Sequence, residues 1–160
     1  MTDTTLRLLA DRAAVADTLH RYAAGLDHGD AELFTSSLTG DATVDLTPAT
    51  TKIGLEFPVL APRDVVVGAL IPAVGPLDTS HVISNIRTTV NGDSASVQCY
   101  AMAQHFPPGE GPKPDRTRHA LMMNRYDADL VRDGETWRIR RLTIDSAWFT
   151  GDPTVLLPES

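Results

Sequence analysis

The sequence predicts an α+β protein in which a curved antiparallel sheet wraps around a long N-terminal helix. Apolar residues recur every three or four positions near the N-terminus, and apolar and polar residues alternate through much of the C-terminal half. Short turn sequences separate the alternating segments. Helices followed by hairpin-linked strands are typical of a sheet that carries its helices on one face. A sheet curled around a helix in this way leaves an internal pocket.

The first predicted helix presents one apolar face, because its large side chains are spaced by four, three and four residues: Val15, Leu19, Tyr22 and Leu26. Either Asp3 or Thr4 can cap its start. Gly25 and Gly29 bracket its end, and a short second helix is expected to follow up to residue 36.

The middle of the chain predicts one strand, one loop and a third helix. Residues 40–46 alternate as a strand does. Residues 49–62 are irregular and interrupted by glycine and proline, which predicts a loop over the mouth of the pocket. The third helix begins at Pro62, and Pro72 marks its last turn.

Four further strands are predicted, at residues 80–90, 94–106, 117–131 and 136–146. The turn Asn91-Gly92-Asp93 is a hairpin signal. The tail, residues 147–160, is expected to lie over the domain or against a neighbouring chain. Neither an internal repeat nor a second domain is apparent, so residues 1–160 are interpreted as a single domain.

Composition excludes several classes of partner. The chain has 160 residues, 42% of them hydrophobic, which suits one domain that is large enough to enclose a pocket. A net charge of -7 argues against binding to nucleic acid or to an anionic membrane. The single cysteine, Cys99, predicts a buried thiol in a reducing compartment. Without a secretory or membrane-spanning segment, we expect a soluble cytoplasmic protein.

Two polar side chains on the first helix are the first candidates for chemistry. Tyr22 lies on the apolar face, and Asp27 follows at the C-terminal end of the helix. The helix dipole disfavours a negative charge there, which predicts a raised pKa for Asp27. A carboxylate of this kind is suited to proton transfer near neutral pH.

Several segments, taken in order, resemble the SnoaL-like group of the nuclear transport factor 2-like superfamily. They are residues 21–30, 40–45 and 79–85, the strand ending Gln104-His105, and residues 134–139. The resemblance implies a cone-shaped sheet with a deep apolar pocket, and assembly into homodimers or homotrimers. It also implies a small apolar substrate for the catalytic members, which include polyketide cyclases, dehydratases, isomerases and epoxide hydrolases.

Two branches of the superfamily suggest roles for individual residues. Tyr22 is similar to an oxyanion-stabilising tyrosine of ketosteroid isomerase, but Leu46 stands where that enzyme has its general base. Asp45 is adjacent and should point to the other side of its strand. Scytalone dehydratase offers a better match, in which Asp27 and His81 correspond to an aspartate–histidine pair. His105 is similar to its second histidine, and Asn124 to a pocket asparagine.

The resemblance therefore implies a cofactor-independent lyase or isomerase that acts on a small, apolar, oxygenated ring, such as a polyketide or steroid-like compound. Asp27 would fix the tautomer of His81, which acts as the base. Tyr22 would donate to a substrate carbonyl, and His105 would be the second proton donor. Three side chains are further candidates for lining the substrate pocket, together with Asn124: Phe106, Met122 and Trp148.

Each candidate also has a structural interpretation. Asp27 can be a solvated helix cap, His81 can bond a loop carbonyl, His105 can lie at the surface, and Tyr22 can be a core aromatic. A metal site made of the two histidines and Asp27 is conceivable, but no compact ligand spacing supports it, so we expect no metal and no cofactor. The alternative functions are a non-catalytic ligand-binding protein, an assembly subunit and an epoxide hydrolase.

Overall fold

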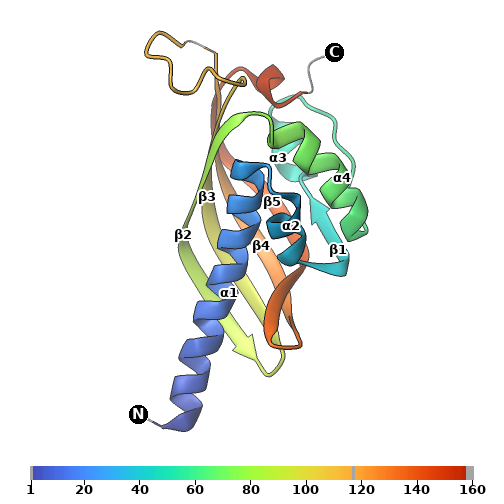
Figure 1. Ribbon diagram of the computed structural model, residues 1–160, viewed down its shortest axis with the longest axis vertical. Helices are drawn as coiled ribbons and strands as arrows, with labels where there is room; N and C mark the ends of the chain where they lie inside the picture. Colours follow the sequence, from blue (N-terminus) through green and yellow to red (C-terminus); the bar gives the residue numbers. More distant parts are fainter. Residues whose placement is uncertain (1, 117, 158–160) are drawn as a thin grey trace.

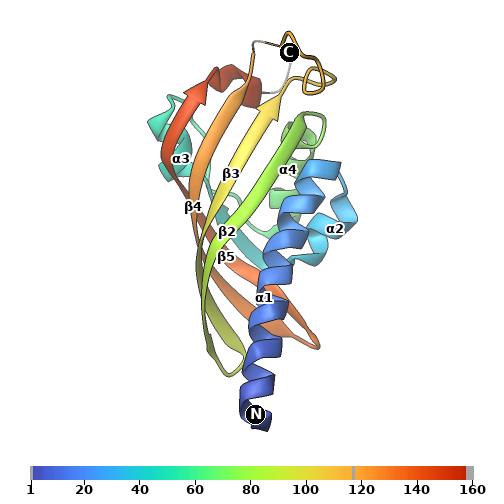
Figure 2. The ribbon, with the colours of Figure 1, turned by 90° about the vertical axis from the view of Figure 1, so that its left-hand side faces the viewer.

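The structure is a computed structural model that describes residues 2–116 and 118–157 (Figure 1). The helices in this part of the chain are α1 (Asp3–His28), α2 (Ala31–Ser36), α3 (Thr47–Lys52), α4 (Arg63–Val74) and the short 3-10 helix η1 (Pro153–Leu156). The strands are β1 (Leu38–Asp45), β2 (Asp78–Asn91), β3 (Ser94–Phe106), β4 (Ala120–Asp133) and β5 (Thr136–Gly151). Figure 2 shows α1 lying lengthwise along the twisted sheet. The predicted α+β class is confirmed.

The sheet is open and has the strand order β1-β5-β4-β3-β2. Neighbours β2 to β5 pair antiparallel, as the hairpin signals predict. β1 instead pairs parallel with β5, with Val44 opposite Leu142, so the expectation of a wholly antiparallel sheet is corrected. Hairpin signals report only strands that follow each other in the chain, and β1 joins a strand that lies almost a hundred residues later.

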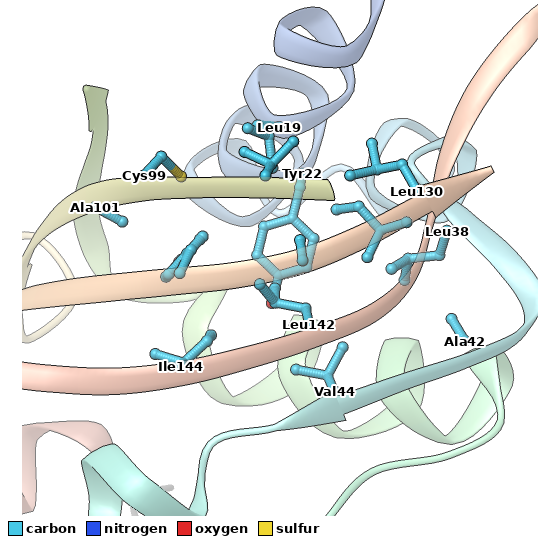
Figure 3. Close-up of a cluster of buried hydrophobic side chains, with 14 of the residues drawn as sticks. Leu19, Tyr22, Leu38, Ala42, Val44, Cys99, Ala101, Leu130, Leu142 and Ile144 are labelled. Carbon is cyan, nitrogen blue, oxygen red and sulfur yellow. The ribbon is translucent and has the colours of Figure 1, made fainter. Parts of the chain in front are cut away.

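Helix α1 buries the predicted stripe against the concave side of the sheet. All four of its predicted inward side chains are buried. Figure 3 shows Leu19 and Tyr22 on the side of α1 that faces the sheet, with the Tyr22 ring extending to Leu142 of β5. The N-cap is Thr2 rather than Asp3 or Thr4, and the helix ends at Gly29, whose φ of 61° is accessible to glycine at little cost.

Helix α3 replaces part of the predicted loop. The segment Thr47–Lys52 is helical, with Pro48 in its first turn, and only the residues that follow it are irregular. Asp45 accepts hydrogen bonds from the backbone N–H and the hydroxyl of Thr47, which supports the start of this helix. Proline in a helix's first turn is favourable, so the threonine- and proline-rich sequence does not exclude a helix. Helix α4 is close to its prediction, with Pro72 in its final turn.

The last strand is longer than predicted. β5 continues to Gly151, so Trp148 and Phe149 belong to the strand and not to a tail. The register shifts where Met123 pairs with Trp148 and Asn124 pairs with Ser146, which leaves Ala147 as an extra residue. A bulge of this kind interrupts the alternation, and the sequence pattern therefore appears to end at Ser146. The predicted strand start at residue 117 and the end of the predicted tail, 158–160, lie outside the described residues.

Strand β3 alternates between buried and exposed residues along most of its length, and its buried side includes Cys99. Burial raises the pKa of the Cys99 thiol to about 12, in agreement with an inert core residue. His105 lies on the same inward side. Alternation in this strand therefore separates His105 from its neighbour Phe106.

Gly25 is where α1 and α2 approach most closely. A Cβ atom at Gly25 would lie 2.6 Å from the Cα atom of Phe34. We expect Gly25→Ala to lower the free energy of unfolding by about 1–3 kcal/mol, because the added methyl group must push α2 away. Gly68→Ala is the matched control, since Gly68 lies in α4 with open space around it and alanine there should stabilise by about 0.5–1 kcal/mol. Urea unfolding of both variants measures this, and a Gly25→Ala variant at least as stable as wild type would contradict the close approach.

Candidate active site

Asp27 is held by three hydrogen bonds from the start of β2. Its Oδ1 accepts from the Thr79 hydroxyl at 2.9 Å and from His81 Nδ1 at 2.6 Å. Its Oδ2 accepts from the backbone N–H of His81 at 2.9 Å. Because a carboxylate only accepts, Nδ1 of His81 is the donor in this contact, and Nε2 is the ring nitrogen that Asp27 does not engage. The two side chains form the pair that the sequence suggested, and His81 lines a cavity.

The pKa of Asp27 shifts in the opposite direction to the prediction. Burial acts to raise this pKa, but the hydrogen bonds and charge of His81 and the hydroxyl of Thr79 together lower it below its ordinary value. The helix dipole considered in the sequence is outweighed by donors that belong to a strand more than fifty residues away. Asp27 is therefore ionised at neutral pH.

The cavity has a volume of about 100 Å³ and lies between α1, the sheet, α3 and α4. Ala103 of β3 is one of the small residues that line the cavity. It is paired with His81 on one side and with Met122 on the other, so its methyl group leaves a gap between two longer side chains. The rest of the lining is mostly apolar, from Leu26 of α1 to Leu156 near the C-terminus. An apolar cavity with a few polar groups is typical of a small-molecule site.

His105 is buried and also lines the cavity, with its ring centroid 5.4 Å from that of His81. Its Nδ1 lies 3.0 Å from the carbonyl oxygen of Ala120, and because a carbonyl only accepts, Nδ1 is the donor. Burial, and then the charge of His81, lower the pKa of His105 to about 4. At neutral pH its Nε2 therefore has a lone pair and no proton.

Two tyrosines line the cavity. Tyr22 is buried, as predicted. Its ring centroid lies 4.8 Å from that of Phe34 and 6.3 Å from that of Tyr126. Burial raises the pKa of both phenols well above 10, so both remain neutral O–H groups. Leu46, at the position of the missing isomerase base, lines the cavity as well, while Asp45 bonds α3 as described above.

Asn124 faces the same space. It is 5% exposed, and within residues 2–116 and 118–157 its Oδ1 has no hydrogen-bond partner. Pairing with Ala101 and Ser146 fixes the register that the sequence alone left open. An unsatisfied buried amide oxygen is costly, and this oxygen can accept a hydrogen bond.

Two of the predicted lining residues lie elsewhere. Met122 lines the cavity, but Phe106 packs beneath the guanidinium of Arg116, 4.6 Å from ring centroid to Cζ. Trp148 is 48% exposed and is absent from the cavity lining. Among the described residues, no group of three histidine, cysteine, aspartate or glutamate side chains converges as metal ligands.

Thr79 and Tyr126 are the site residues that the sequence interpretation gave no role. Thr79 stands two positions before His81, and residues so spaced in a strand share a face, which was the available signal. Tyr126 shares a face with Met122 and Asn124 in the same way. Nothing in the sequence separates a lining residue from other inward residues of the sheet.

An open curved sheet with a long helix across it is the fold expected of the nuclear transport factor 2-like superfamily. Within that superfamily, the chain belongs to the SnoaL-like domain family, which matches residues 7–143.

Three similar proteins illustrate the relationship. Terrestric acid biosynthesis cluster protein E of Penicillium crustosum is 33% identical over 147 residues, which cover 90% of this chain and 88% of the relative. A protein assigned as a scytalone dehydratase from Novosphingobium aromaticivorans superposes with a TM-score of 0.75 at 21% identity, over 95% and 92% of the two chains. A hexachlorocyclohexane dehydrochlorinase from Novosphingobium barchaimii superposes with a TM-score of 0.71 at 18% identity, over 93% and 94%. None of the helices in the described part of the chain is long and apolar enough to cross a membrane.

The pKa of His105 predicts a pH dependence of stability. The pKa is about 4 in the folded protein and 6.5 for an ordinary histidine, so below pH 6.5 the unfolded chain binds a proton that the folded protein does not. The stability present above pH 6.5 is lost as the pH falls toward 4, by on the order of 3 kcal/mol. Urea unfolding at pH 7 and pH 4.5 should show that the free energy of unfolding falls less in His105→Asn than in wild type. Equal losses in the two proteins would contradict a neutral, buried His105.

Proposed function

We propose that this protein is a cofactor-independent lyase or isomerase that removes a proton next to a carbonyl group of a small, mostly apolar ring compound. The observation that carries the proposal is the 2.6 Å contact between Asp27 Oδ1 and His81 Nδ1 at the edge of the cavity. It makes Nε2 of His81 the basic nitrogen that is left for a bound molecule. The ionised carboxylate stabilises the imidazolium that forms when Nε2 takes a proton.

In the proposed dehydration, Nε2 of His81 takes the proton from the carbon beside the carbonyl, and the electrons of that bond form an enolate. A neutral phenol, Tyr22 or Tyr126, donates a hydrogen bond to the developing oxyanion. The enolate then re-forms the carbonyl and a carbon–carbon double bond, and the β-hydroxyl leaves with the proton from His81 as water. A β,γ-unsaturated ketone without a leaving group would give a dienolate, and return of the proton to its γ-carbon gives isomerisation. Attack of an enolate on a second carbonyl gives ring closure, and the alkoxide that forms takes the proton from His81.

His105 takes a different role from the one expected from the sequence. Because its Nδ1–H is engaged by Ala120 and its Nε2 has no proton, we assign it to accept a hydrogen bond from a substrate hydroxyl. Asn124 is assigned to a second polar group of the substrate, and Met122 to its apolar surface. Phe106 and Trp148 are left out of the proposed binding site.

The relatives support the type of reaction. The dehydratase and the dehydrochlorinase are both named for an elimination, in which a carbon loses a proton and a neighbour loses a leaving group. The 33% identical relative is named as part of a biosynthetic cluster for an organic acid. These names suit an oxygenated small-molecule substrate for this chain.

The small volume of the cavity favours a second candidate. About 100 Å³ is less than the 300–1,000 Å³ of typical ligand pockets. An assembly subunit of the same fold, which fills its pocket with its own side chains, would also have a small cavity. Measured proton abstraction distinguishes the two candidates.

Exchange of hydrogen for deuterium beside the carbonyl of cyclohexanone in D₂O, followed by NMR, tests proton abstraction without the natural substrate. We expect Asp27→Asn and His81→Gln each to lower the enzyme-catalysed rate by about 100-fold or more. His20→Gln is the matched control, because His20 is exposed on α1 away from the cavity, and it should keep the wild-type rate. Exchange that is absent from wild type, or unchanged in both variants, would overturn the proposed function.

We also propose that a second copy of the chain covers the outer face of the sheet. Val82, Met102, Met123 and Trp148 stand side by side on four paired strands. Three of them are at least 38% exposed. A contiguous apolar row on an outer face is typical of an interface.

Sedimentation velocity tests this surface. We expect Trp148→Lys to shift the protein toward monomer, because it places a charge within the apolar row. Val59→Lys is the control, since Val59 is equally exposed but lies in the irregular segment before α4. A monomeric wild type, or an assembly that is unchanged in Trp148→Lys, would contradict the interface.

A further inference from the structure

The cavity shares a wall with a second hollow. A groove of about 700 Å³ lies outside it, between the C-terminal end of α4, the segment after β3 and the segment around η1. Ala73 of α4 and Leu157 after η1 line both hollows. Since Ala73 has only a methyl group, the side chain of Leu157, which is 45% exposed, is the larger part of this partition.

The groove is lined mainly by proline and other apolar residues, together with Arg118 and Thr154. Pro72 and Pro76 line one side, and Pro107 and Pro108 line another. Proline has a fixed φ and little side-chain freedom, so a molecule placed between these residues costs the protein little conformational entropy. Leu157 can change rotamer, and its movement would connect the groove with the cavity that contains His81.

Arg118 gives the groove a polar end. Its Nε donates to Asp152 Oδ2 at 3.1 Å, and its Nη2 donates to the Thr154 hydroxyl at 3.0 Å. Asp152 in turn accepts from the backbone N–H and the hydroxyl of Thr154, so the guanidinium is oriented by a fixed turn. Nη1 donates to none of the residues that the structure describes. A guanidinium held in this way can bind a carboxylate, although Asp152 offsets part of its charge.

We propose that the groove binds a substituent of the substrate, an apolar chain that ends in a carboxylate, while the ring occupies the cavity. Leu157 is then the residue that determines which substituted rings can bind, and Arg118 is the residue that recognises the carboxylate. The inference rests on the proposed function, because it places the ring beside His81. It explains how a cavity of about 100 Å³ serves a larger molecule: only part of that molecule has to enter.

Isothermal titration calorimetry with matched ketones tests the proposal independently of turnover. The probes are cyclohexanone, cyclohexanones with an alkyl chain of two, four or six methylene groups at C-3, and the same chains ending in a carboxylate. NMR signals of the His81 and His105 imidazoles report whether the ring occupies the cavity. We expect one chain length to bind best, and its carboxylate form to bind about threefold to fivefold more tightly than its alkyl form.

Variants test the two residues separately. Arg118→Gln should remove the preference for the carboxylate over the alkyl probe of equal length. Arg116→Gln should keep that preference, because Arg116 is a nearby cation that packs on Phe106 and does not line the groove. Leu157→Trp should weaken the binding of the chain-bearing probes by tenfold or more relative to that of cyclohexanone. The larger side chain would fill the space between the groove and the cavity.

The outcomes separate this inference from the proposed function. If cyclohexanone shifts the two imidazole signals but neither chain nor carboxylate adds affinity, the groove is not a substrate subsite and the proposed function stands. A carboxylate preference that survives Arg118→Gln overturns the role of Arg118. If no probe perturbs His81 or His105, the proposed function fails and the inference fails with it.

Discussion

The carboxylate of Asp27 is the contact on which the site depends. It joins the last turn of α1 to the first residues of β2, and it accepts from Thr79 and twice from His81. A half-buried carboxylate without partners would be costly, but this one exchanges its hydration for three donors. The same bonds that fasten the helix to the sheet also determine which nitrogen of His81 carries the proton. The hydrogen bonds of Asp27 therefore both stabilise the packing of α1 against β2 and orient the His81 imidazole.

The two cavity histidines show how surroundings separate the properties of identical side chains. Nδ1 of His81 donates to an ionised carboxylate, whereas Nδ1 of His105 donates to a neutral backbone carbonyl. Burial, and then the charge of His81, lower the pKa of His105 to about 4, although its hydrogen bond to Ala120 acts in the opposite direction. The ring centroids are 5.4 Å apart, and both rings line the same cavity. The proposed function assigns proton transfer to the first ring and acceptance of a hydrogen bond to the second.

Most of the fold could be predicted from the sequence, because periodicity and turn residues are local properties. The parallel pairing of β1 with β5 could not, since no local signal reports it. The pair of Asp27 and His81 was reached through resemblance to a family, while the direction of the Asp27 pKa shift depended on donors that only the folded chain brings near. Phe106 could have been set aside from sequence, because it is adjacent to His105 in a strand and must face the other way. Trp148 could not be set aside from sequence, because the bulge at Ala147 interrupts the alternation that would show on which side of the sheet Trp148 lies.

Ala103 has a consequence for how such a protein can change over time. Ala103 lines the cavity, and its methyl group stands between His81 and Met122 on the paired strands. A larger or smaller residue at this one place would resize the chamber, while the carboxylate, the imidazoles and the helices kept their contacts. In the proposed function, the size of the bound molecule and the chemistry performed on it therefore depend on separate positions, so a substitution at Ala103 would change which molecules fit without removing the groups that perform the reaction.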